Sequence, residues 1–373
     1  MAKRKIAFII TQLQLGGAQK SVLYSVNNLP KDKFETYLLC GPGGFFDEEA
    51  KKEIKNLFFI SDLQRAINFK KDFLAFKQIR KTLKEIKPDI VHTNSSKAGL
   101  LGRIACASLG LKCVHTVHGF AFNSEQKLPV RMIYIFLEAF CSLMTKKIIF
   151  VANSDMDLTK KYKIAPKRKF ALIRAGVEVK TKKDFPSFDK DKKLKELNLT
   201  KENKIVLSIA NLKPQKNPLD MIRVAKIVCE KFPKTVFLFL GTGPLKEDSE
   251  ALIKEYHLEN NFKLLGHRTD TTELLLISDV FALSSLWEGL PMALVEALNM
   301  EVPCVCYNVN GVKEVLKNNK NGFLCPSRNY KKLAQNILSI LEGSFKFTPI
   351  DLTEFDIKNM VQKQADLYES LLK

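Results

Sequence analysis

Two series of short apolar runs, each alternating with helix-like segments, constrain the fold of this chain most strongly. Strands that alternate with helices are typical of mostly parallel sheets covered by helices, which bind ligands beyond the carboxyl ends of their strands. The sequence therefore predicts an α/β protein with two doubly wound, Rossmann-like domains. The runs of the first series are Ile6–Thr11, Phe34–Leu39, Leu57–Ile60, Ile90–Thr93, Cys113–Val117, Ile148–Ala152 and Phe170–Ile173.

A Lys-rich, polar segment separates the two series and predicts the domain boundaries. We assign residues 1–180 to an N-terminal domain, residues 181–203 to a linker and a solvated helix, and residues 204–353 to a C-terminal domain. Glycine, proline and charged residues that interrupt apolar periodicity are typical of such connections.

Bulk composition excludes several classes of protein. No apolar run of the 373 residues approaches the ~20 residues that a membrane-spanning helix needs. The eight cysteines are scattered and form no C-x-x-C pair. We expect reduced thiols in the core of a cytosolic protein, and neither a zinc site nor a disulfide framework.

The positive charge of the chain is concentrated in its first half. Residues 1–185 hold 34 Lys and Arg against 16 Asp and Glu, whereas residues 186–373 hold 26 against 24. A Lys-rich composition alone does not explain this asymmetry. The electrostatic potential of this excess positive charge favours an anionic partner. A membrane surface, a lipid phosphate or a nucleic acid would each fit.

One stretch of the second series predicts a phosphate site. The apolar run Val280–Leu283 is followed by a small polar turn, and Pro291 then opens a helix that carries Glu296. A loop that leads into a helix offers backbone N–H groups and the positive end of the helix dipole to an anion. Glu288 and Glu296 would repel that anion, so they are better suited to accept hydrogen bonds from hydroxyls. Phosphate between two sets of hydroxyls indicates a nucleotide-sugar.

Polar residues also follow strands of the first series. His118 and Gly119 come directly after one strand, where the imidazole could contact an acceptor hydroxyl. His92 and His115 lie within predicted strands, where a structural hydrogen bond explains them equally well. Gly16 and Gly17 stand at the first strand-to-helix turn, where glycine lets the backbone come close to a bound group.

Three of these motifs resemble those of the family 4 retaining glycosyltransferases. E-G-L-P-x4-E begins at Glu288, N-L-x-x-x-K runs from Asn211 to Lys216, and G-G-A-Q begins at Gly16. The motifs occur in the family's order, and the resemblance spans nearly the whole chain. It implies the GT-B fold, in which two Rossmann-like domains face a cleft and the C-terminal helix, here 354–373, crosses back to the N-terminal domain.

The resemblance implies a role for each motif residue. Lys216 would grip the donor diphosphate, and Glu288 would accept hydrogen bonds from the donor sugar. Glu296 would hold the ribose hydroxyls, while His118 would orient the acceptor or the sugar C6 hydroxyl. We take Lys216, Glu288 and His118 as catalytic. The other expected donor-binding residues are Gly16, Gly17, Asn211, Lys213, Gly243, His267, Gly289, Leu290, Pro291, Met292 and Glu296.

Asn211 departs from the family's pattern, which has an arginine at this position. Asn donates a hydrogen bond but supplies no charge to a phosphate. Our hypothesis is that Lys213 compensates. The resemblance further implies a mechanism that retains the anomeric configuration and requires neither a metal nor another cofactor. Asp155 and Asp157 form a D-x-D pattern, but this pattern lies at a predicted helix start.

The resemblance and the charge together predict the substrates and location. We expect transfer of a hexose or N-acetylhexosamine from a nucleotide-diphospho-sugar, UDP-linked, to a polyprenyl-linked or other glycan acceptor in bacterial surface polysaccharide or lipopolysaccharide assembly. The protein would be cytoplasmic and bound peripherally to the anionic inner face of the cytoplasmic membrane. The apolar helix from Val130 is predicted to be mostly buried against the sheet. Lys127 and Arg131 offer an alternative, in which the preceding loop dips toward lipid.

Two other functions fit parts of the sequence. A nucleotide-sugar 2-epimerase shares the fold but would need a different set of acidic and basic residues. A nucleic-acid-binding protein would explain the charge, but the sequence shows no recognisable binding module or basic-aromatic alternation. We therefore expect no nucleic acid among the partners.

Overall fold

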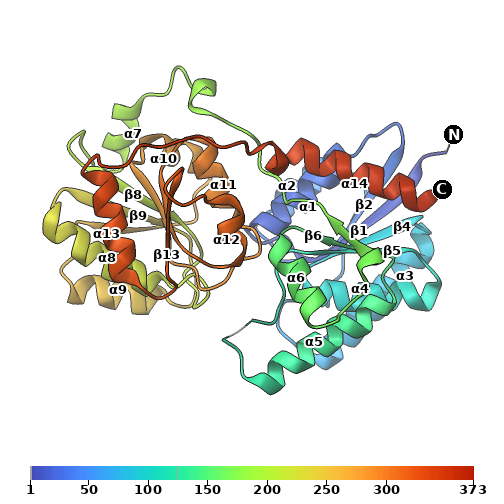
Figure 1. The fold of residues 1–373 in the computed structure, drawn as a ribbon. Coiled ribbons are helices and arrows are strands. Elements are labelled where there is room, and N and C mark those ends of the chain that lie inside the picture. Colours follow the sequence, from blue (N-terminus) through green and yellow to red (C-terminus); the bar gives the residue numbers. More distant parts are fainter. Residues whose placement is uncertain (1, 124) are drawn as a thin grey trace. The chain divides into compact units, whose positions relative to one another are not determined.

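The chain forms two compact units. The computed structural model describes residues 2–123 and 125–373. Unit 1 comprises residues 1–177 together with 354–373, and unit 2 comprises residues 178–353 (Figure 1). The observed divisions thus fall three residues before the predicted end of the first domain, and at the predicted start of the C-terminal helix.

Unit 1 is built on a seven-stranded sheet with the order β3-β2-β1-β4-β5-β6-β7. All of its strand pairs are parallel. The central strands are largely buried, as expected for strands covered on both faces. The strands are β1 (Arg4–Gln12), β2 (Phe34–Gly41), β3 (Leu57–Phe59), β4 (Ile90–Asn94), β5 (Cys113–Val117), β6 (Lys147–Phe150) and β7 (Phe170–Leu172).

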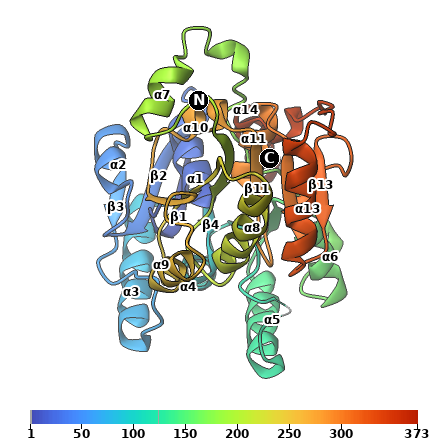
Figure 2. The same ribbon diagram turned by 90° about the vertical axis from the view of Figure 1, so that its left-hand side faces the viewer.

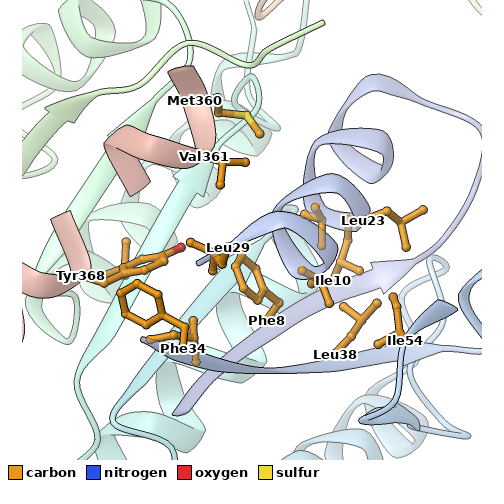
Figure 3. Close-up of a cluster of buried hydrophobic side chains, with 14 of the residues drawn as sticks. Phe8, Ile10, Leu23, Leu29, Phe34, Leu38, Ile54, Met360, Val361 and Tyr368 are labelled. Carbon is orange, nitrogen blue, oxygen red and sulfur yellow. The ribbon is translucent and has the colours of Figure 1, made fainter. Parts of the chain in front are cut away.

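Helices cover both faces of this sheet. On one face, α1 and α14 share a buried cluster with β1 and β2. Figure 3 shows Tyr368 of α14 beside Phe34, and Met360 and Val361 farther along the same helix. On the other face, α3 and α4 bury a second cluster. The C-terminal helix therefore packs on the first domain, as predicted. The helices are α1 (Gly17–Asn28), α2 (Asp47–Glu53), α3 (Phe69–Ile86), α4 (Ser96–Leu109), α5 (Leu128–Leu143), α6 (Asn153–Lys161) and α14 (Ile357–Leu372).

Unit 2 repeats the plan with a six-stranded parallel sheet, ordered β10-β9-β8-β11-β12-β13. Its strands are β8 (Lys204–Ile209), β9 (Thr235–Leu240), β10 (Phe262–Gly266), β11 (Val280–Leu283), β12 (Cys304–Tyr307) and β13 (Gly322–Cys325). Its helices are α7 (Lys190–Glu196), α8 (Pro218–Lys231), α9 (Lys246–Glu255), α10 (Thr271–Ile277), α11 (Met292–Asn299), α12 (Asn310–Val315) and α13 (Tyr330–Leu341). Both predicted doubly wound sheets are present.

The order of the strands reverses once in each sheet. In unit 1 the reversal lies between β1 and β4, and in unit 2 it lies between β8 and β11. At such a point the chain leaves the two neighbouring strands in opposite directions, which opens a crevice outside their carboxyl ends where ligands bind. Ligand-binding motifs are therefore expected close to these two points.

The predicted linker is wrong in one respect, because most of it belongs to unit 2. Within residues 181–203, Lys193 of α7 is 5% exposed and forms ion pairs with Glu196, Asp270 and Glu273. These contacts fix α7 against the start of α10. The segment is therefore a structured part of unit 2.

One further prediction changes with the structure. The helix α5 is not mostly buried: Ile133, Phe136 and Leu143 are 60%, 69% and 76% exposed. The eight cysteines are all buried free thiols, as predicted. Within the described residues, no helix combines the length and apolarity needed to cross a bilayer.

Candidate active site

The motif residues of unit 2 meet at its strand reversal. The loop after β8 carries Lys216, and the loop after β11 carries Glu288. The Lys216 ammonium forms an ion pair with Oε1 of Glu288, although 72 positions separate them in sequence. Both side chains are largely removed from water, with 20% and 7% of their surfaces exposed. The sequence predicted both residues for the site, and the structure places them in direct contact.

Hydrogen bonds between the two loops hold this pair in place. Leu286 donates its backbone N–H to the Gln215 carbonyl at 2.8 Å, and Gln215 Nε2 donates to the Trp287 carbonyl at 2.8 Å. Ser284 Oγ lies within hydrogen-bond distance of the Lys216 and Asn217 carbonyls, at 3.0 and 2.8 Å. Gln215 and Ser284 therefore position the loops rather than face a ligand.

Two glycines allow close backbone contacts beside the pair. A Cβ on Gly311 would stand 1.5 Å from the Gly289 carbonyl oxygen, and a Cβ on Gly243 would stand 2.3 Å from the Leu212 carbonyl oxygen. Neither distance can be accommodated without moving backbone. Gly243, predicted to be near the donor, thus packs the loop after β9 against the loop after β8.

The start of α11 is the place for which the sequence predicts an anion site. Pro291 is the N-cap and Met292 begins the helix, so the first-turn N–H groups lack helical partners. Leu290 is buried beneath this turn, while Glu296 lies half-buried in the following turn. Ser285 Oγ is buried and has no hydrogen-bond partner.

The ion pair leaves hydrogen-bonding capacity for an anion. A lysine ammonium has three N–H donors, and Glu288 uses one of them. Lys216 can therefore bridge the Glu288 carboxylate and a phosphate oxygen, with the first turn of α11 as the other donor group. Glu288 keeps acceptor capacity on its carboxylate for a hydroxyl.

The other predicted donor residues lie on neighbouring strand ends. Asn211 and Lys213 belong to the tight turn after β8, in which the Lys213 N–H donates to the Asn211 carbonyl at 2.8 Å. His267 follows β10, where its Nε2 lies 2.9 Å from Thr242 Oγ1 at an exposed position. His267 is therefore two strands away from the reversal, whereas Lys213 is three residues from Lys216.

In unit 1, His118 lies within a network of neutral histidines. Its Nε2 donates to Asn94 Oδ1 at 3.0 Å, which leaves Nδ1 as the acceptor of the ring. Desolvation lowers the pKa of His118 to about 4, so the imidazole is neutral near pH 7. Asn94 ends β4 beside the strand reversal, and a small pocket contains both side chains. The sequence did not identify Asn94 as the partner of His118.

The two other histidines have the structural role that the sequence left open. Nδ1 of His92 lies 2.5 Å from Tyr368 Oη, and Nε2 lies 2.6 Å from Thr116 Oγ1. His115 Nδ1 lies 2.9 Å from Thr93 Oγ1. Burial lowers the pKa of His92 to about 3 and that of His115 well below its usual value. Both rings are buried and hydrogen-bonded to neighbouring elements of unit 1, which is a structural role.

The glycine turn after β1 adopts the expected position. Gly16 is the N-cap of α1 and Gly17 is its first residue. A Cβ on Gly16 would lie 2.7 Å from Gln19 Oε1, and Gln19 Nε2 donates to the Gln12 carbonyl at 3.3 Å. The turn is thus folded back on the end of β1, at the strand reversal of unit 1.

Comparison with known proteins identifies the family of the chain. Residues 15–181 match the family described as Glycosyltransferase Family 4, and residues 189–350 match Glycosyl transferases group 1. The chain is 38% identical to the Escherichia coli UDP-Gal:alpha-D-GlcNAc-diphosphoundecaprenol alpha-1,3-galactosyltransferase, over 98% of this chain and 97% of that protein. The chain belongs to the family 4 glycosyltransferases.

Solved structures share the fold of this glycosyltransferase. Anabaena HepE in complex with UDP and glucose superposes with a TM-score of 0.82 at 18% identity, covering 98% of this chain and 100% of HepE. Sucrose-phosphate synthase from Thermosynechococcus elongatus gives a TM-score of 0.83 at 17% identity, covering 99% of each chain. The predicted GT-B fold is therefore confirmed.

One acidic cluster of the glycosyltransferase has metal-like spacing. Carboxylate oxygens of Glu196, Asp270 and Glu273 lie within 4.8 Å of one another. The Lys193 ammonium already lies among them, 2.9 Å from Glu196 and 2.8 Å from Glu273, and Arg268 adds a second cation. These cations neutralise the carboxylates, so we interpret the cluster as structural.

Proposed function

We propose that this glycosyltransferase moves a hexose from a UDP-hexose to a glycan attached to a polyprenyl diphosphate. The galactosyltransferase from Escherichia coli makes UDP-galactose the first donor to test and an N-acetylglucosaminyl-diphospho-lipid the first acceptor. The observation that carries the proposal is the Lys216–Glu288 pair at the β8/β11 reversal, beside the start of α11.

In the proposed reaction, charge develops on the leaving diphosphate. The C1–O bond to UDP breaks while the acceptor oxygen forms a bond to C1 on the same face, and the hydroxyl proton passes to a departing phosphate oxygen. The Lys216 ammonium and the α11 N–H groups stabilise that oxygen, which is preorganised electrostatic catalysis. Glu288 accepts a hydrogen bond from the sugar and fixes its orientation. The reaction would retain the anomeric configuration and require no metal.

The acceptor is proposed to bind in unit 1. The neutral ring of His118 has Nδ1 as an acceptor for a sugar hydroxyl, while Asn94 fixes the ring through Nε2. We also propose peripheral association with the cytoplasmic face of the membrane, because the acceptor carries a long polyprenyl chain. The excess positive charge of unit 1 supports this location, since unit 1 holds 34 Lys and Arg against 18 Asp and Glu.

A product assay tests the reaction directly. Purified protein is incubated with UDP-galactose, UDP-glucose, UDP-N-acetylglucosamine or UDP-N-acetylgalactosamine, and with a short-chain N-acetylglucosaminyl-diphospho-lipid. We expect a disaccharide product with one donor, an α anomeric proton by NMR, and an unchanged rate in EDTA. A β product would contradict retention, and an EDTA-sensitive rate would contradict metal independence.

A matched pair of variants tests the site. Glu288→Gln should lower kcat at least about tenfold, because a neutral amide is a weaker acceptor for the sugar hydroxyl. Glu202→Gln changes an exposed glutamate that is paired with Lys234 in the same unit, and it should leave the rate unchanged. Equal rates for the two variants would remove Glu288 from the active site.

A further inference from the structure

Unit 1 exposes an apolar face that the glycosyltransferase reaction does not use. Among the described residues, 11 of the 14 exposed large hydrophobic side chains belong to two short segments. We call them together the α3–α5 face. Its residues are Ile67, Phe69, Phe73 and Leu74 at the start of α3, and Leu128, Val130, Met132, Ile133, Phe136, Phe140 and Leu143 of α5.

The helix α5 is oriented with its apolar side toward solvent. Its only charged residues are Arg131 and Glu138, and Glu138 pairs with the buried Arg103 of α4 at 2.9 Å. Phe136 and Phe140, one helical turn apart, are 69% and 46% exposed. A surface helix in water normally presents polar residues outward. The outer side of α5 is therefore suited to an apolar environment.

Both segments lie at the outer boundary of unit 1. In both views α3 and α5 flank α4 (Figures 1 and 2), and α4 contacts each of them. Each helix connects parallel strands, so each begins at the carboxyl edge of the sheet. Lys97 at the start of α4 pairs with Asp72 at the start of α3 at 2.6 Å, which agrees with this placement. His118 lies at the same edge, after β5.

Basic residues surround the apolar ones. Residues 65–86 contain seven Lys and Arg against two Asp and Glu, and one of those two acids, Asp72, is neutralised by Lys97. Lys77 Nζ lies 4.6 Å from the centre of the Phe73 ring. Exposed Lys127 and Lys146 lie just before and after α5. An exposed apolar face bordered by basic side chains complements a surface that is apolar inside and anionic outside.

We infer that the α3–α5 face inserts into an anionic lipid bilayer and brings His118 to the membrane surface. The inference rests on the proposed function for the identity of the acceptor, and it goes beyond charge attraction by specifying an apolar contact. A helix of 16 residues is about 24 Å long, so α5 would lie in the interface plane. The diphosphate of a polyprenyl acceptor lies at that level.

Vesicle flotation tests the inference without donor or acceptor. Wild-type protein is mixed with phosphatidylcholine vesicles, with or without 30% phosphatidylglycerol, in 0.1 and 0.5 M NaCl. We expect binding to the anionic vesicles that weakens in high salt but persists, because apolar contacts are not screened. Binding abolished by 0.5 M salt, or none to anionic vesicles, would overturn the inference.

Variants separate the two parts of the face. Ile133→Gln with Phe136→Gln should lower the partition coefficient at least about tenfold at both salt concentrations. Lys70→Gln with Lys71→Gln should lower it only in 0.1 M NaCl. Val179→Gln changes an exposed aliphatic residue outside the face and should have no effect. Unchanged binding by the first variant would contradict insertion.

Two further measurements distinguish insertion into lipid from self-association of the chain. Phe136→Trp, made with Trp287→Phe, should give an indole emission that brominated lipids quench; no quenching would exclude insertion.

Sedimentation without lipid tests the competing occupant, a second copy of the chain. The lipid inference would be overturned if the wild-type chain formed a dimer and the double variant Ile133→Gln with Phe136→Gln were a monomer. Transfer to a water-soluble acceptor should be unchanged in that variant, so failure of transfer and failure of docking are distinguishable.

Discussion

The two units present polar sites of opposite kinds at the carboxyl edges of their sheets. In unit 2, Lys216 and Glu288 form an ion pair at the strand reversal. In unit 1, His92, His115 and His118 are hydrogen-bonded and neutral. A lysine ammonium interacts strongly with phosphate, whereas a neutral imidazole suits a hydroxyl. The same sheet architecture thus supports two chemistries, because different side chains end equivalent strands.

The largest effect is expected in unit 2. Lys216→Met should lower kcat by about 10²–10³-fold, the range seen when one preorganised donor to a developing charge is removed. The measurement is steady-state transfer from the productive UDP-sugar. Lys234→Met, in the exposed pair with Glu202, is the matched control and should retain wild-type turnover. Wild-type kcat in the Lys216 variant would mean that this charge does not act on the leaving group.

A smaller effect is expected in unit 1. His118→Ala should lower kcat/KM for the acceptor about tenfold while leaving the donor KM unchanged, because one hydrogen bond to a hydroxyl is lost. The pKa of His118 is about 4, so its contribution to the rate should be constant from pH 6 to 8 and fall on approach to pH 4.

The control for this variant is His257→Asn. His257 is exposed in unit 2 and has a left-handed backbone that asparagine tolerates. A His118→Ala variant that raises the donor KM would instead assign the ring to donor binding.

Unit 1 should lose stability at a higher pH than unit 2 when the protein is acidified. The folded pKa values of His92 and His118, about 3 and about 4, lie below the usual 6.5. Their stabilising contribution is complete above pH 6.5 and decreases as pH falls, by about 1.4 kcal/mol per pH unit for each histidine. In unit 2, pairing with Arg268 and Lys193 holds the pKa of Asp270 below its usual 3.8, so that contribution is lost only in stronger acid.

Trp287, the single tryptophan, makes this difference measurable. Its fluorescence reports on unit 2, while hydrogen exchange of peptides from β4 and β5 reports on unit 1. We expect loss of protection in unit 1 at a higher pH than the change in Trp287 emission. Simultaneous transitions would show that the histidines of unit 1 do not set its acid sensitivity.

Much of this fold could be predicted because its signals are local. A buried parallel strand such as β5 is a short run of apolar, β-branched residues, and its predicted bounds agree with the structure. The Lys216 and Glu288 motifs were likewise recognisable from their neighbours. Their ion pair was not, because contact across 72 positions depends on the order of β8 and β11 in the sheet.

The orientation of α5 shows a limit of the sequence pattern. From Leu128 to Leu143 only two residues are charged, so periodicity does not indicate which side faces the sheet. The buried residues of this helix are few because α4 and the loop near Phe122 cover only one side of it. The partners Asn94 and Tyr368 were also missed, since a polar residue on a buried strand or helix gives no local sign of its contact.

The smallest expected effect tests how the neutral network of unit 1 is held. Tyr368→Phe removes the hydroxyl 2.5 Å from His92 Nδ1 and leaves that buried nitrogen without its partner. Because both groups are buried, we expect a loss of about 1–2 kcal/mol in the free energy of unfolding. The midpoint should fall by a few degrees in a thermal scan. We expect kcat to be unchanged, because both ring nitrogens of His92 are bonded within the protein, to Tyr368 and Thr116. Lowered kcat at unchanged stability would instead place α14 in the active site. The neutral, hydrogen-bonding site of unit 1 would then include the C-terminal helix, whereas the charged site of unit 2 would not.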